Sequence, residues 1–229
     1  MFKKTQLLGV MAVAGLLMGP AMSVKAAGDV GTPPATTQVT AGFIAGGGPS
    51  NPVDPTNPTG PTVTDPDNPG TGATGALRLN YVSNRIDFGR QPIQSDTTKR
   101  IGTDASNTIS GYQSAQVADE RGTNAGWALK VSGTELTSGS DKLEGATLKL
   151  PKGDVVTASG VSNGAVASEV TNALDTGGTL LSATAGNGGG LTVDRWLPGA
   201  AELTIIGGTA EVKDYSGTLT WTLQDTPTR

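Results

Sequence analysis

The fold class is decided by a stretch near the C-terminus, LTWTLQ at residues 219–224. Leucine and tryptophan alternate there with threonine and glutamine, and a period of two is typical of a β-strand with one buried face. An earlier stretch, GWALKV at residues 126–131, shows the same alternation. Both contain the triplet Trp-x-Leu, in which the two large side chains point to the same face of the strand. We therefore expect two strands with closely similar apolar faces.

Short alternating runs also occur elsewhere in the C-terminal part of the chain. They begin near residues 77, 146 and 203 and are separated by clusters of Gly, Asn, Asp and Ser, which is typical of an all-β sandwich. No window shows a convincing apolar stripe with a helical period. We therefore predict an all-β protein with a single β-sandwich-like domain at residues 76–229.

Residues 1–26 predict a secretory signal peptide. Lys3 and Lys4 precede an apolar stretch from Leu7 to Val24, and small residues around Ala26 provide a cleavage site. The short length of the segment and its Gly and Pro residues favour removal over retention as a membrane anchor. No second apolar run of membrane length follows. We expect a secreted chain that does not span the membrane after signal removal.

Residues 27–75 have the composition of a disordered, acidic linker rich in Pro, Gly and Thr. Prolines recur at every third position from Pro49 to Pro61, which is the period of a polyproline II helix. No basic residue lies between Lys25 and Arg78, and apolar residues are few. Because such a segment gains too little apolar burial to offset its loss of chain entropy, we expect a spacer that does not pack.

Composition excludes several classes of function. The chain contains no Cys and no His, which removes disulfides, Ser-His-Asp or Cys-His catalysis and His-based zinc sites. We expect no cofactor and no metal. The formal net charge is −4 at pH 7, and loss of the signal peptide would remove lysines but no acidic residue. Because phosphate binding needs a basic surface, we expect no nucleic-acid partner.

Residues around the two triplets form an ordered set. It comprises Asp87-Phe88-Gly89, then Asp119, Arg121-Gly122 and Gly126-Trp127, then Gly145-Ala146-Thr147-Leu148, and finally Tyr215 before Thr218-Leu219-Thr220-Trp221. This set resembles the WxL family, which consists of surface proteins of low-GC Gram-positive bacteria with a C-terminal wall-binding domain. The resemblance covers residues 76–229.

The resemblance implies non-covalent attachment to the cell wall, with peptidoglycan as the ligand and the cell surface as the location. Only a spacer precedes the predicted domain, so we expect a small subunit of a complex formed with co-encoded cell-surface proteins. The alternative is a protein–protein interaction module that binds such a surface protein or a host component. A wall hydrolase is a third class of function.

The cluster Asp119-Glu120-Arg121 is the most suggestive group for catalysis. Two carboxylates serve a glycosidase only when they face each other across a sugar, whereas adjacent residues of an extended segment point apart. We expect a structural role, with Arg121 holding a turn or pairing with a carboxylate. We therefore predict that the protein is not an enzyme.

The resemblance makes Trp127, Leu129, Trp221 and Leu223 the candidate wall-binding motif. Two roles stay open for these residues. Strand alternation favours burial in the core, whereas open indole rings would stack on the sugar faces of peptidoglycan. Trp196 precedes a predicted turn at residues 197–199, and we expect it to be more exposed than either triplet Trp.

Overall fold

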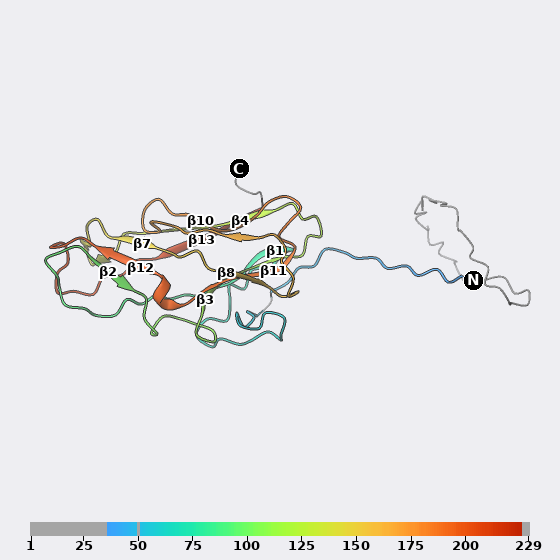
Figure 1. Cartoon of the computed structure of the whole chain (residues 1–229), viewed down its shortest axis with the longest axis horizontal. Helices are drawn as coiled ribbons and strands as arrows, with labels where there is room; N and C mark the ends of the chain where they lie inside the picture. Colours follow the sequence, from blue (N-terminus) through green and yellow to red (C-terminus); the bar gives the residue numbers. More distant parts are fainter. Residues whose placement is uncertain (1–35, 50, 226–229) are drawn as a thin grey trace, which may run out of the picture. The chain divides into compact units, whose positions relative to one another are not determined.

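The computed structural model describes residues 36–49 and 51–225, and its regular elements all follow residue 76 (Figure 1). Predicted signal-peptide residues 1–26 lie outside the described residues. The domain described below belongs to the unit that begins at Phe43. Its elements are short antiparallel strands and one 3-10 turn, η1 (Pro198–Ala200). The predicted all-β class is confirmed.

Two four-stranded antiparallel sheets form the body of the domain. The first has the order β1 (Leu77–Val82), β3 (Gln113–Asp119), β11 (Gly190–Trp196) and β8 (Asp154–Thr157). The second has the order β13 (Leu219–Gln224), β4 (Trp127–Gly133), β10 (Gly178–Ala183) and β9 (Val166–Ala167). Figure 1 shows them as two layers.

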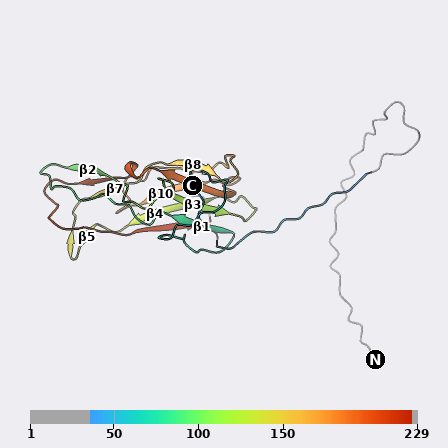
Figure 2. The ribbon, with the colours of Figure 1, turned by 90° about the horizontal axis from the view of Figure 1, so that it is seen from below.

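A smaller sheet and a hairpin complete the domain. The three-stranded sheet has the order β2 (Thr98–Ile101), β12 (Glu202–Ile205) and β7 (Thr147–Lys149), and the hairpin joins β5 (Thr137–Ser138) to β6 (Asp141–Lys142). Figures 1 and 2 both place β2 and β7 at one end of the two larger sheets.

The core lies between the two larger sheets, because each presents an apolar face to the other. Pairing registers align Trp127 with Ala183 and Leu129 with Leu181 on the second sheet, and Val117 with Leu79 on the first. These side chains belong to one continuous apolar cluster. Burial of apolar area stabilises such a core by about 25 cal/mol per Å². The arrangement is the predicted β-sandwich.

The segment from residue 51 to residue 75 covers the outer face of the first sheet, which corrects the prediction that it does not pack. Pro52, Val53 and Pro55 are buried. The Gln116 side chain accepts a hydrogen bond from the Val53 N–H at 3.0 Å and donates one to the Val53 carbonyl at 2.9 Å. An extended Pro-rich chain leaves its backbone polar groups free, and the polar outer face of the sheet binds them.

Further hydrogen bonds fasten the same segment along β1. The Asn68 amide donates to the Val82 carbonyl at 2.7 Å, and the Thr71 N–H donates to the Asn80 carbonyl at 3.2 Å. The Tyr81 hydroxyl lies 3.2 Å from an Asp65 carboxylate oxygen. These contacts offset the loss of chain entropy on ordering of the segment. Composition alone predicted that this loss would prevent the segment from packing.

Arg121 has the structural role that its position predicts. Its guanidinium bonds the Asp119 carboxylate at 2.8 Å and the Gly126 carbonyl at 2.9 Å, so it closes the turn before β4. Burial would raise the pKa of Asp119, but hydrogen bonds from the Arg121 side chain and backbone outweigh it and lower the pKa. Glu120 points to Arg78 instead, at 2.8 Å.

We expect a chain that begins at residue 76 to be less stable than one that begins at residue 43. Loss of the two Gln116 hydrogen bonds alone removes roughly 1–3 kcal/mol of net stabilisation, and the outer face of the sheet becomes exposed. Urea unfolding of both chains measures the difference. The chain from residue 43 should match the full-length protein, and equal stability of the two shortened chains would contradict a structural role for residues 51–75.

Candidate functional site

Trp127 and Leu129 of the first triplet are core residues. Both side chains are 0% exposed, so neither can touch a wall polymer in this structure. The Trp127 indole N–H donates a hydrogen bond to the Gly188 carbonyl at 3.0 Å. Such a partner is what a buried indole requires. The first triplet therefore supports the domain from inside.

The Gly-rich loop at residues 186–190 closes over this indole. Gly188 is buried and has a positive φ of 84°. A Cβ at this position would lie 2.5 Å from Trp127 Nε1 and closer still to the Ala183 side chain. Only glycine lets the loop backbone approach the ring closely enough to accept its hydrogen bond.

We expect Gly188→Ala to destabilise the domain by about 2–5 kcal/mol, because a positive φ strains any L-residue and the new methyl group overpacks the core. Gly186→Ala is the matched control. Gly186 lies in the same loop with a φ of 89°, but no other atom lies within 4 Å of the position that a Cβ would take there, so its cost should be about 1–2 kcal/mol. Urea unfolding measures both, and equal losses would contradict the close approach.

Trp221 and Leu223 of the second triplet are only half-buried. They lie on β13, which among the described strands pairs only with β4 and forms the edge of its sheet, with Trp221 opposite Val131 and Leu223 opposite Leu129. The inner faces of both strands therefore match, as the sequence predicts. Because β13 lies at the margin of its sheet, its apolar face is only partly covered.

Trp221 lines a cavity of about 1230 Å³. Its walls come from the loop after β1, from β2, β7 and β12, from the loop before β13 and from β13 itself, together with single side chains from the segments between β4 and β10. They include residues of the motif set, among them Phe88, Leu148, Tyr215 and Leu219, and the further apolar side chains of Leu136, Leu143, Leu174, Leu203 and Ile205. The motif residues that are far apart in the sequence thus meet around one hollow.

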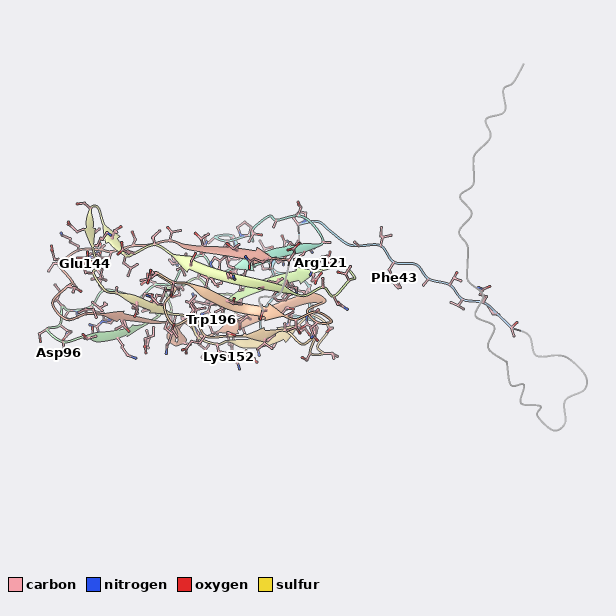
Figure 3. The ribbon with its side chains drawn as sticks, turned by 90° about the horizontal axis from the view of Figure 1, so that it is seen from above. Phe43, Asp96, Arg121, Glu144, Lys152 and Trp196 are labelled. Atoms are coloured by element: carbon pink, nitrogen blue, oxygen red, sulfur yellow. The ribbon has the colours of Figure 1, made fainter. Side chains whose placement is uncertain are left out.

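Leu223 lines a second, smaller hollow on the same margin of the sandwich. Its lining also includes Ala76, Leu77, Leu79, Arg121 and Asp225. Figure 3 shows Asp96, which lines the larger cavity, at the end of the domain away from Arg121. The face of β13 therefore contributes to two hollows that lie toward opposite ends.

Several charged side chains around the larger cavity form ion pairs. Arg90 contacts Asp214, and Lys213 lies against Asp141 and 2.8 Å from Glu211. Hydrogen bonds to Asp141 and Glu211 raise the pKa of Lys213, so it stays protonated at neutral pH. The paired acids offset the positive charge of Lys213.

Trp196 corrects a prediction, because it is buried to 95%. Residues 198–200 do form the predicted turn, η1. However, Trp196 is the last residue of β11 and belongs to the core cluster, whereas Leu197 after it is exposed. Strand alternation continues up to the turn, and it is the leucine that faces outward.

Within residues 36–49 and 51–225, no group of three or more acidic side chains could hold a metal ion. No helix among the described residues is long and apolar enough to cross a membrane. The sequence analysis did not predict Leu174, which lines the larger cavity. The sequence pattern around Leu174 is weak, because residues 172–177 belong to no strand.

The comparisons with known proteins identify the family of this β-sandwich domain. Residues 32–227 match a family described as "WxL domain surface cell wall-binding". The chain belongs to this WxL family. The match begins well before residue 76 and includes the segment that covers the first sheet. The family binds the wall and is not a family of enzymes. No curated protein and no solved structure matches the chain.

Proposed function

We propose that this domain holds a secreted chain non-covalently on the cell wall by binding peptidoglycan at the cavity beside β13. The observation that carries the proposal is the contrast between the two triplets. Trp127 is sealed in the core, whereas Trp221 is partly exposed and lines a cavity of about 1230 Å³. A cavity of this size accommodates a segment of polymer.

The surroundings of the cavity support a binding role. Ile93, Ile206 and Val212 are exposed apolar residues, and all three line the cavity. A cluster of exposed apolar side chains with a polar rim marks an interaction site. Trp221 and Phe88 add aromatic rings of the kind that stack on sugars, and the paired charges of the rim supply hydrogen-bonding groups.

We expect Trp221→Ala to bind protein-free peptidoglycan about tenfold more weakly, a loss of roughly 1.4 kcal/mol. The matched control is Thr222→Ala, because Thr222 lies on the same strand with its side chain exposed on the opposite face. Co-sedimentation of the full chain with purified wall material measures binding. Thermal melts confirm that both variants are folded.

The variant Trp127→Phe distinguishes a residue that stabilises the fold from a residue that contacts the ligand. It should lower stability by removing the indole bond to Gly188, but the protein that remains folded should bind as wild type. Unchanged binding by Trp221→Ala would contradict the cavity as the site. If the wild type itself does not bind protein-free peptidoglycan, the alternative applies, in which the module binds a co-encoded surface protein or a host component. Release of sugars from the same material would indicate a hydrolase.

Retention on the wall should increase as pH falls toward the sequence pI of 4.8. The chain is acidic at neutral pH and a Gram-positive wall is anionic, so long-range repulsion opposes binding and is weakened by protonation or by screening. Added salt at pH 7 should therefore strengthen retention. Retention that declines steadily with salt would contradict this account and indicate a local basic contact.

A further inference from the structure

Asp194 is a buried acid that the wall-binding function does not use. It lies on β11, between Ala115 of β3 and Val155 of β8 in the pairing registers. Both neighbours belong to or pack on the core cluster, so the carboxyl group points into the sandwich. Its side chain is 0% exposed, and neither carboxyl oxygen has a hydrogen-bond partner among the described residues.

The packing around this carboxyl group is tight. Gly153, just before β8, lies against it so closely that a Cβ at that position would overlap Asp194 Oδ1. Figure 3 marks Trp196, two residues further along β11, in the middle of the domain. Its indole N–H and the Gln113 side-chain oxygen opposite it are also buried without partners in the described part of the chain.

Within residues 36–49 and 51–225, no positively charged side chain of the surrounding elements contacts the Asp194 carboxyl group. Arg195 points to the opposite face, where it bonds Asp154 at 2.7 Å and lies over the Tyr112 ring. The titratable residue of β3 is Asp119, which Arg121 holds at the far end of the strand. Inward residues of the facing sheet, such as Trp127, Leu129, Ala167 and Leu181, do not titrate. The charged group that acts on Asp194 is Asp154, an acid.

We infer that Asp194 is protonated in the folded protein, so that the domain is more stable in mild acid and becomes less stable as the pH rises. An unpaired carboxylate in an apolar interior is strongly unfavourable. Protonation removes the charge and adds an O–H donor on a face that also holds the unpartnered Gln113 oxygen. The inference does not depend on what the domain binds.

The pH range over which the stability changes follows from the burial of Asp194. Burial, and secondarily the nearby Asp154 charge, raises the pKa of Asp194 from 3.8 to about 8. A group whose pKa is higher in the folded state contributes stability that is complete below pH 3.8 and is lost as pH rises through about 8. The chain has no His, so no other side chain with an ordinary pKa titrates between pH 5 and 8.

Thermal melts of the full chain from pH 5 to pH 9 test the inference. The wild-type melting temperature should fall by about 3–5 °C per pH unit up to pH 8 and then level off. Asp194→Asn, which cannot ionise, should show no fall in this window. The matched control Asp154→Asn removes the neighbouring acid and should keep the fall, because Asp194 can still ionise.

Two further measurements keep the test decisive if Asp194→Asn does not fold. The carboxyl carbon of Asp194 in the folded wild type, followed by NMR, should titrate with a midpoint well above pH 6. A midpoint below pH 5, or an equal pH dependence in wild type and Asp194→Asn, would overturn the inference. So would a melting temperature at pH 8 that rises with Ca²⁺ and falls with a chelator, since a bound cation would then neutralise the charge.

Discussion

The hydrogen bond from the Trp127 indole to the Gly188 carbonyl is the interaction on which the rest of the domain depends. It lets the largest side chain of the core be fully buried without an unsatisfied N–H. It also draws the loop between β10 and β11 over the end of the second sheet. Since β10 and β11 belong to different sheets, this loop is one of the connections between the two sheets.

The first triplet is buried, whereas the second lies on a face that is only partly covered. β4 is an inner strand and β13 is an edge strand, so the same Trp-x-Leu pattern is sealed in one case and half-open in the other. Trp221 packs against the core cluster and also lines the cavity. One motif thus serves stability at its first occurrence and, in the proposed function, recognition at its second.

Most of the fold could be predicted from local pattern, because alternation with a period of two reports the buried face of a strand directly. The resemblance to the WxL family could also be recognised from the sequence, because it depends on motif residues that occur in a fixed order along the chain. Three features could not be predicted in this way. Segment 51–75 packs because of a Gln116 side chain some 60 residues away, Trp196 is buried because β11 continues to the turn, and the cavity gathers residues from segments that are far apart in the chain.

The sequence by itself determined the all-β class, the inward face of each triplet strand and the WxL family. These properties depend on residue type and on spacing along one strand, which are local quantities. Only the tertiary structure decided that Trp127 is sealed while Trp221 lines a cavity, and that an acid lies between the sheets with no partner among the described residues. Exposure depends on whether a strand lies inside or at the edge of its sheet, and that position is set by pairing between distant parts of the chain.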